Sequence, residues 1–207
     1  MKITYIEKQK NNSNRYNIFV DGNYCFSAEL EDIIKYQIDI DRIFSKEELE
    51  KIIEKCEISK GFKYGLNLLS NKDYTKSEMF DKLKEKGYSD NSIEVILDKL
   101  CEYGFVDDMK YAEKFAYRKV KLNKIGKKRI INDLKNKGIE AEILDKIQFD
   151  EEEILNNAYA LLIKKLKGNK KDKESLQKAI RYLYNKGYTF EEIKKAVFKI
   201  NNEIDWE

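Results

Sequence analysis

One pattern of residues occurs three times in this chain, and it limits the fold more than any other feature of the sequence. Each copy has a leucine, a glycine four residues later, a tyrosine or isoleucine directly after the glycine, and an apolar residue six positions beyond the glycine. The glycines are Gly87, Gly138 and Gly187, which are 51 (138 − 87) and 49 (187 − 138) residues apart. Repetition at a nearly constant interval of this size is typical of tandem supersecondary units.

Each copy of the pattern is interpreted as the end of one helix and the start of the next. A glycine after the last helical turn adopts the left-handed conformation without a steric penalty at Cβ, and the apolar residue after it packs against the helix. The chain contains no proline, which agrees with a nearly uninterrupted series of helices. The sequence therefore predicts a mainly α protein of tandem three-helix repeats in an elongated, curved array, because such units bury their apolar faces by stacking.

The first thirty residues differ from the rest and predict a small antiparallel β-sheet. Three short segments, 2–8, 15–20 and 24–27, are rich in β-branched and aromatic residues and are separated by polar stretches. Asp21 and Gly22 stand between the second and third segments, and Asp-Gly in that position is a strong hairpin signal.

Capping residues mark the starts of several helices. Ser45, Thr75 and Thr189 are each followed three residues later by glutamate, which is the capping-box pattern, and Asp107 is expected to be an N-cap. We expect helices over 28–36, from Ser45 through Leu69, from Thr75 to Gly87, and over 90–103, 108–122, 126–137, 140–147, 151–167, 173–186 and 190–200. Within the long helix, Gly61 and Gly65 are expected to mark close packing or a break. The chain then divides into a sheet with a linking helix (1–60) and three three-helix repeats (61–108, 109–149 and 150–207).

Charge is distributed unevenly along the chain, although the net charge is only +3. Residues 21–60 contain 11 acidic and 6 basic residues, whereas residues 110–137 contain 11 basic and 2 acidic residues. Such asymmetry bears on the partners of a protein rather than on its fold. The middle of the chain is expected to bind a polyanion or an acidic groove of another protein.

Several classes of function lack the residues that they need. The chain has no histidine, no phosphate-binding GxxxxGK[ST] motif and no cysteine pair at metal-ligand spacing. We therefore expect no enzymatic activity, no cofactor, no metal site and no disulfide framework. Three dispersed cysteines and the lack of a signal peptide or an apolar membrane span predict a cytosolic protein. Asp107 and Asp108 are interpreted as an N-cap and a first-turn acid, with a metal site as the less favoured alternative.

Eight basic residues in the second repeat are the candidate binding residues. The first four are spaced 4, 4 and 3 residues apart, which places them along one helical face, and the other four follow around Gly126. Tyrosines at 111 and 117 are interleaved with them. A plain solvated face remains the alternative interpretation. This central basic strip consists of Lys110, Lys114, Arg118, Lys121, Lys124, Lys127, Lys128 and Arg129.

A second basic cluster lies in the third repeat, around Gly168 and Asn169. We interpret it either as a solvated loop between helices or as a secondary contact, and the sequence leaves both open. Tyr88 and Tyr188, which follow two of the repeated glycines, are expected to belong to the core. The second cluster consists of Lys164, Lys165, Lys167, Lys170, Lys171 and Lys173.

The chain resembles the RecX family, regulators of the RecA recombinase. The resemblance covers residues 62–139 with good specificity and the third repeat more loosely, and the N-terminal sheet is similar to the extension of longer members. The residues that carry it are Leu68-Leu69-Ser70, Tyr74-Thr75-Lys76-Ser77-Glu78, Leu83, Lys86-Gly87, Tyr103-Gly104-Phe105-Val106-Asp107-Asp108, Tyr111-Ala112, Phe115, Arg118, Gly126, Arg129-Ile130, Leu134 and Lys137-Gly138-Ile139.

This resemblance implies a monomeric, non-enzymatic modulator of RecA, foremost an inhibitor. Such proteins bind the RecA monomer or the groove of the RecA–DNA filament and alter its ATPase and strand exchange. Two alternatives remain at this point. One is a helical module that binds single- or double-stranded DNA directly, and the other is a purely structural adaptor.

Overall fold

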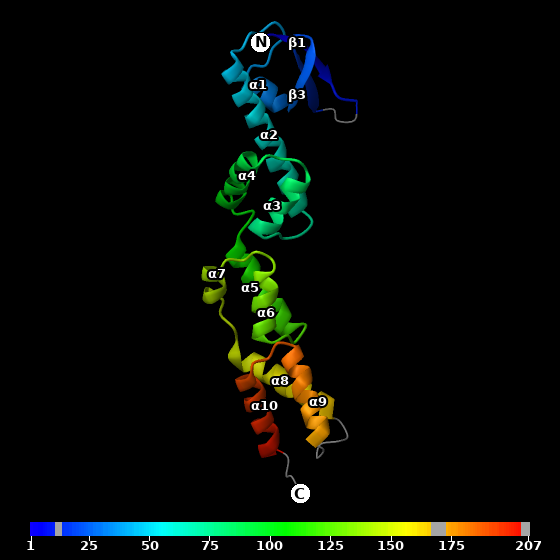
Figure 1. Cartoon of the computed structure of the whole chain (residues 1–207), viewed down its shortest axis with the longest axis vertical. Helices are drawn as coiled ribbons and strands as arrows, with labels where there is room; N and C mark the ends of the chain where they lie inside the picture. Colours follow the sequence, from blue (N-terminus) through cyan, green and yellow to red (C-terminus); the bar gives the residue numbers. More distant parts are fainter. Residues whose placement is uncertain (11–13, 167–172, 204–207) are drawn as a thin grey trace. The chain divides into compact units, whose positions relative to one another are not determined.

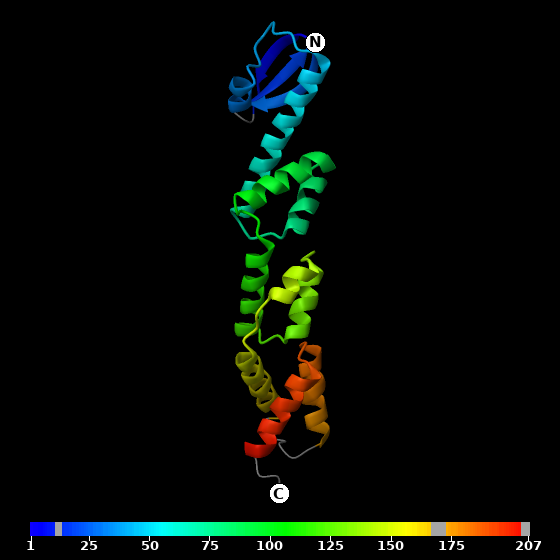
Figure 2. The same cartoon turned by 90° about the vertical axis from the view of Figure 1, so that its left-hand side faces the viewer.

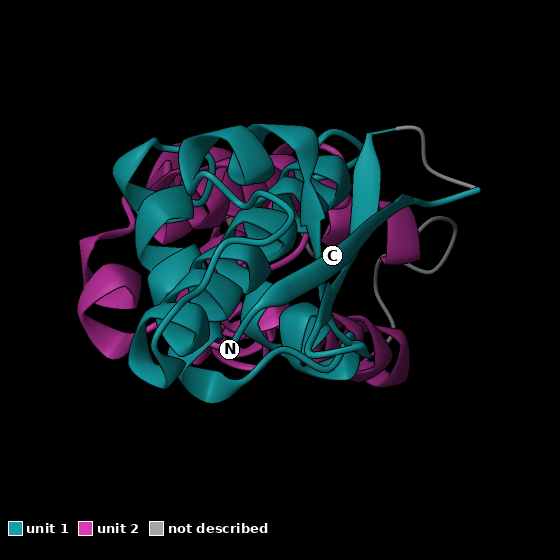
Figure 3. Ribbon diagram, turned by 90° about the horizontal axis from the view of Figure 1, so that it is seen from above, with its two compact units in different colours: residues 1–74, 79–106 teal, residues 75–78, 107–207 magenta. Residues whose placement is uncertain are grey.

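The computed structural model describes residues 1–10, 14–166 and 173–203 (Figure 1). The chain forms two compact units, which Figure 3 shows in different colours. Unit 1 contains Met1–Tyr74 and Met79–Val106, and unit 2 contains Thr75–Glu78 and Asp107–Glu207. The prediction of a mainly α protein with three-helix units and an N-terminal antiparallel sheet is confirmed.

Unit 1 begins with a three-stranded antiparallel sheet in the order β1-β2-β3. The strands are β1 (Ile3–Lys8), β2 (Arg15–Val20) and β3 (Asn23–Glu29). Asp21 and Gly22 have φ angles of 48° and 84°, so both occupy the left-handed region that a two-residue hairpin turn requires. The predicted hairpin is therefore confirmed, and the short helix α1 (Leu30–Lys35) follows it.

The long helix α2 (Lys46–Leu69) passes from the sheet to α3 (Lys76–Glu85) and α4 (Asp90–Glu102), as Figure 2 shows. Its capping box is formed, because the Ser45 hydroxyl accepts from the Glu48 amide while the Glu48 carboxylate accepts from the Ser45 amide. The helix does not break at its glycines. A Cβ on Gly61 would lie 2.2 Å from Cδ1 of Ile96, so this glycine allows α4 to pack closely against α2.

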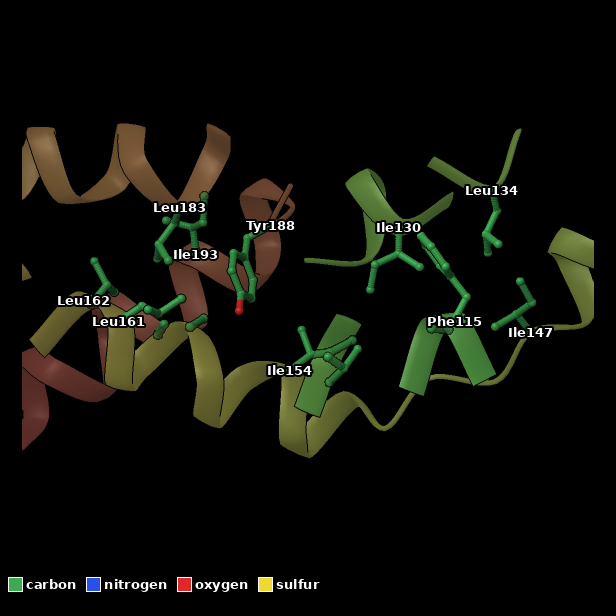
Figure 4. Close-up of a cluster of buried hydrophobic side chains, with 14 of the residues drawn as sticks. Phe115, Ile130, Leu134, Ile147, Ile154, Leu161, Leu162, Leu183, Tyr188 and Ile193 are labelled. Atoms are coloured by element: carbon green, nitrogen blue, oxygen red, sulfur yellow. The ribbon is translucent and has the colours of Figure 1, made fainter. Parts of the chain in front are cut away.

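The described residues of unit 2 from Asp107 onward form the helices α5 to α10 around one continuous apolar core. Figure 4 shows ten labelled members of that core, from Phe115 to Ile193, and Tyr188 is only 1% exposed. Tyr88 is 6% exposed in unit 1, so the prediction that both tyrosines belong to the core is confirmed. The helices are α5 (Asp108–Lys121), α6 (Lys127–Lys135), α7 (Ala141–Lys146), α8 (Glu151–Leu166), α9 (Lys173–Asn185) and α10 (Phe190–Glu203).

The repeated glycines all end helices in the left-handed conformation, with φ angles of 90°, 78° and 90° at Gly87, Gly138 and Gly187. The last of them has a second role, because the turn that contains it packs against the start of α6. The Gly126 amide donates to the Lys186 carbonyl at 3.0 Å, and the Lys128 amide donates to the Gly187 carbonyl at 3.1 Å.

The turn at Gly138 is used in the same way within unit 2. The Thr75 hydroxyl donates to the Lys137 carbonyl at 2.7 Å, and a Cβ on Gly138 would lie 2.3 Å from Cβ of Ser77. Thr75 is fully buried and also forms its predicted capping box with Glu78. The repeat pattern thus specifies a helix end and, at two of its three copies, a contact with the start of another helix.

Candidate binding surface

The first half of the central basic strip lies on the solvent-exposed side of α5. Lys110, Lys114, Arg118 and Lys121 are exposed there, whereas the apolar residues of the helix are buried. This division follows from the helical spacing of the two sets, because residues three and four apart share a face. The buried residues of α5 are Ala112, Phe115, Ala116 and Val120.

Lys110, Lys121 and Lys127 of the strip form ion pairs with carboxylates of unit 2. Lys110 Nζ lies 3.2 Å from Asp107 Oδ2, and Lys121 Nζ lies 3.0 Å from Glu153 Oε2. Lys127 Nζ lies 3.2 Å from Oε1 of Glu151 at the start of α8. The hydrogen bond to Glu153 raises the pKa of Lys121 above its ordinary value. These three lysines therefore present less net positive charge than the sequence pattern suggests.

Four other strip residues have no ion-pair partner within the part of the chain that the structure describes: Arg118, Lys124, Lys128 and Arg129. Arg118 is exposed on α5, and Lys124 is half-buried in the connection to α6, where its carbonyl accepts from the Tyr188 hydroxyl. Lys114 also interacts within the chain and is not part of this unpaired set.

Lys128 and Arg129 extend toward α9, which the sequence analysis did not connect with the strip. Lys128 Nζ lies 5.5 Å from the ring centroid of Tyr184, and Arg129 donates to the Asn185 carbonyl at 3.4 Å. Tyr184 is 59% exposed. Beside it, α9 and α10 line a cavity of about 330 Å³. The lining residues are Gln177, Ile180, Arg181, Tyr184, Phe190 and Ile193.

Arg181, Tyr184 and Phe190 are thus surface residues that sequence reasoning missed. Phe190 is 77% exposed, and Arg181 is exposed without an ion pair among the described residues. The spacing of three between Arg181 and Tyr184 is compatible with one helical face, but exposure of an aromatic residue cannot be read from spacing alone.

A groove of about 510 Å³ runs beside α5 and the connection from α7 to α8. Its apolar lining includes Tyr117, which is 67% exposed, and Phe149. Its charged lining carries both signs and includes the paired Lys121 and Glu153. The tyrosine that the sequence analysis placed within the strip is therefore a groove residue next to it.

The second basic cluster is described only in part. Lys164 and Lys165 are exposed at the end of α8, and Lys165 Nζ lies 4.5 Å from the ring centroid of Tyr182. Lys167, Lys170 and Lys171 lie outside the described residues. Whether this cluster is a solvated loop or a secondary contact stays an open prediction.

The adjacent Asp107 and Asp108 act as helix-capping residues. Asp107 accepts from the Lys110 amide at 2.9 Å, which holds the pKa of Asp107 below its ordinary value. Asp108 accepts from the Lys76 amide at 2.8 Å, and burial raises its pKa. The N-cap interpretation of Asp107 is confirmed, and among the described residues no group of three or more potential ligands is placed to hold a metal ion.

The fold and this surface define a class of protein. Tandem three-helix units carry unpaired cations beside exposed aromatic rings. Within residues 1–10, 14–166 and 173–203, no helix is long and apolar enough to cross a bilayer. These features are typical of a protein that binds another macromolecule.

Known proteins of one family are similar to this chain over nearly its full length. Models of one family match four consecutive segments: the regulatory protein RecX N-terminal domain at residues 1–45, and the first, second and third RecX three-helix domains at residues 62–100, 107–146 and 151–197. A regulatory protein RecX from Listeria monocytogenes serotype 4a is 34% identical over 99% of this chain and 78% of the relative. One from Clostridium perfringens strain SM101 is 36% identical over 97% of both chains.

Solved structures are similar as well. A crystal structure of regulatory protein RecX has a TM-score of 0.72 at 28% identity and covers 93% of this chain and 98% of its own. The RecX structure from Lactobacillus salivarius has a TM-score of 0.67 at 25% identity, over 70% of this chain and 97% of its own. The chain belongs to the RecX family and is a non-enzymatic regulatory protein. The family modulates the RecA recombinase in DNA repair.

Proposed function

We propose that this chain regulates RecA by binding the recombinase, as a monomer or in the groove of its DNA filament, through the unpaired part of the central basic strip. The observation that carries the proposal is the set of Arg118, Lys124, Lys128 and Arg129, which have no ion pair within the described residues. A cation without an ion pair can bind a carboxylate or phosphate of another molecule without first breaking an ion pair within its own chain. Such charges also accelerate encounter with an acidic surface.

The aromatic residues beside these cations support a protein interface. Tyr184 and Phe190 are both more than half exposed and lie next to Lys128 and Arg181. Aromatic and arginine side chains are enriched among the residues that dominate binding energy at protein interfaces. Binding across two subunits would hold the filament against the rearrangement that ATP hydrolysis requires, which is how the ATPase and strand exchange would be inhibited.

The test is RecA ATPase activity on single-stranded DNA, titrated with the full chain and with two matched variants. Arg118→Gln/Lys128→Gln/Arg129→Gln removes three unpaired cations, and Lys110→Gln/Lys121→Gln/Lys127→Gln removes three paired ones. We expect the concentration for half-inhibition to rise about tenfold in the first variant. In the second variant we expect a much smaller rise in that concentration. Unchanged ATPase turnover at several-fold excess of the unaltered chain would refute the proposal.

The alternative is direct binding of DNA by the helical units, with RecA affected only indirectly. The phosphate-binding capacity of the same unpaired cations supports this alternative. Titration onto DNA without recombinase separates the two functions. Tight, salt-sensitive binding to DNA alone that Arg118→Gln/Lys128→Gln/Arg129→Gln weakens favours the alternative, whereas an effect of that variant only with the assembled filament favours the recombinase.

The chain is further proposed to act as a monomer in the cytosol. Its three cysteines are free thiols: Cys25 is exposed, Cys101 is half-buried and Cys56 is buried. Burial raises the pKa of Cys56 to about 12, so this thiol stays protonated and unreactive at neutral pH. Sedimentation of the reduced protein across a range of concentrations tests the monomeric state.

A further inference from the structure

Unit 1 contains a cavity that the proposed function does not use. It is lined by residues of α1, α2 and α4 and of the segments that directly follow α1 and α4, and its volume is about 200 Å³. The three helices can be followed in Figure 1. The lining residues are Asp32, Lys35, Tyr36, Lys55, Ile58, Ser59, Phe62, Lys99 and Tyr103.

Three lysines from three different helices converge on this cavity. Lys35, Lys55 and Lys99 are exposed, and none forms an ion pair within the described residues. The ammonium groups of Lys35 and Lys55 lie 5.4 and 5.5 Å from the ring centroid of the same residue, Tyr36. Lys35 and Lys55 lie in a segment, residues 21–60, that carries 11 acidic against 6 basic residues, so their convergence is not the result of a local excess of lysine.

The acid at the cavity cannot neutralise all three lysines. Asp32 is 5% exposed, and its carboxylate forms a hydrogen bond with the Ser59 hydroxyl. It carries at most one negative charge, and burial raises its pKa. Among the residues that line the cavity, at least two positive charges therefore remain, which favours an anionic ligand.

One wall of the cavity is an exposed aromatic cluster. Tyr103 is 66% exposed, and its ring centroid lies 5.9 Å from that of Phe62 and 6.3 Å from that of Phe105. Phe105 is itself 51% exposed. Aromatic rings beside a group of unpaired cations are the combination that binds single-stranded nucleic acid, because bases stack on the rings while phosphates meet the cations.

We propose that this cavity is a binding site for single-stranded nucleic acid, with a backbone phosphate among Lys35, Lys55 and Lys99 and an adjacent base stacked on Tyr103. A duplex does not fit this arrangement, since its bases are already stacked on one another. An acidic peptide would satisfy the lysines but would leave the aromatic wall unused. The site is in unit 1 and does not depend on binding to a recombinase.

The first test measures the binding of a fluorescein-labelled oligothymidylate to the full chain by anisotropy, without recombinase, over a range of salt concentrations. Lys35→Gln/Lys55→Gln/Lys99→Gln is compared with Lys8→Gln/Lys46→Gln/Lys84→Gln, which removes the same charge from unit 1 away from the cavity. Because the three lysines together neutralise one phosphate of a single strand, the slope of log K against log salt is expected to fall by about 0.7 in the first variant. We expect a much smaller change in the control. Equal changes in both variants would show only general electrostatic attraction and would overturn the proposal.

The second test concerns the base. Tyr103→Ala is expected to weaken oligothymidylate binding about tenfold, whereas Tyr103→Phe is expected to keep it, because stacking needs the ring and not the hydroxyl. Thermal unfolding followed by circular dichroism checks that both variants remain folded. Equal affinity of Tyr103→Ala and the unaltered chain would contradict base stacking.

Competitors then identify the class of ligand. The competitors are an unlabelled abasic phosphate polymer and oligoglutamate, each compared with unlabelled oligothymidylate. If either one displaces the labelled oligonucleotide as effectively as oligothymidylate, the assignment to bases is overturned. Weak displacement by either polymer supports it. Because no recombinase is present, failure of these tests would leave the proposed ATPase regulation intact.

Discussion

The turns at Gly87 and Gly187 have the same local sequence pattern and the same φ angle of 90°, yet they are used differently. A Cβ on Gly87 would meet no atom within 4 Å. A Cβ on Gly187 would lie 2.3 Å from Cβ and 2.6 Å from the amide nitrogen of Arg129. The first glycine therefore serves only its own helix end, whereas the second also lets the start of α6 pack against the turn.

This difference shows that an internal repeat can specify one local conformation and two tertiary roles. The left-handed conformation follows from the residues next to each glycine. The close contact depends on what packs against the turn, which differs from copy to copy. Four predictions test this comparison.

The largest effect is expected from alanine at the two glycines. Gly187→Ala should lower the free energy of unfolding by about 3 kcal/mol, because it adds a clash with the α6 backbone to the strain of a left-handed alanine. Gly87→Ala should cost only about 1 kcal/mol, since it has the strain alone. Chemical denaturation followed by circular dichroism measures both. Similar losses in the two variants would show that the Gly187 contact has no energetic importance.

The next effect concerns two capping boxes, one at Thr75, which contacts the Gly138 turn, and one at Thr189, which follows Gly187. Thr75→Ala should cost about 2 kcal/mol, since the Thr75 hydroxyl both accepts from the Glu78 amide and donates to the Lys137 carbonyl. Thr189→Ala should cost about 1 kcal/mol, because among the described residues this hydroxyl forms only the capping hydrogen bond from the Glu192 amide. Thr75→Ser keeps both hydrogen bonds and serves as the control. A Thr75→Ala loss no larger than that of Thr189→Ala would contradict a tertiary role for this hydroxyl.

A smaller effect is expected at the glycines within α2. Alanine has the better helix propensity, by about 1 kcal/mol. At Gly65 the new Cβ would lie 3.0 Å from Cδ1 of Leu100, so Gly65→Ala should be close to neutral. At Gly61 it would lie 2.2 Å from Cδ1 of Ile96, and Gly61→Ala should be destabilising by about 1 kcal/mol. Thermal unfolding measures which of the two variants is the more stable. If Gly61→Ala were the more stable, α4 would have to move aside freely.

The smallest effect is a dependence on pH at Asp107 and Asp108. The pKa of Asp107 is lowered by the Lys110 amide, so its stabilising contribution is present above the unfolded pKa and is lost as the pH falls through the folded pKa. Burial raises the pKa of Asp108, so the pH dependence of its contribution to stability has the opposite sign. That contribution is present below the unfolded pKa and is lost as the pH rises through the folded pKa. Unfolding of Asp107→Asn and Asp108→Asn between about pH 3 and pH 7 measures both. We expect the destabilisation by Asp107→Asn to shrink at low pH, and parallel curves for the two variants would contradict the opposite signs.

Much of the fold could be predicted because its signals act over a few residues. The hairpin at Asp21-Gly22, the capping boxes and the helix ends at the repeated glycines depend on neighbours within one turn. Helix bounds differ from the expected ones by at most three residues, and the largest difference is at α10, which extends to Glu203. The boundaries of the four proposed domains stay a prediction.

Less of the candidate surface could be predicted. The spacing of Lys110, Lys114, Arg118 and Lys121 indicated a shared face, and the structure places all four on the exposed side of α5. It could not indicate that Lys121 and Lys127 meet Glu153 and Glu151 of α8, because those pairs join residues 32 and 24 positions apart.

By itself, the sequence determined to within a few residues where the helices and strands begin and end, that three copies of one unit exist, and that positive charge is concentrated in the second. The tertiary structure alone decided which cations are paired, which glycines are in close contact, and that Tyr184 and Tyr103 stand exposed beside lysines. The physical reason is range: helix ends and turns depend on adjacent residues, whereas ion pairs and packing depend on residues that only the folded chain brings together.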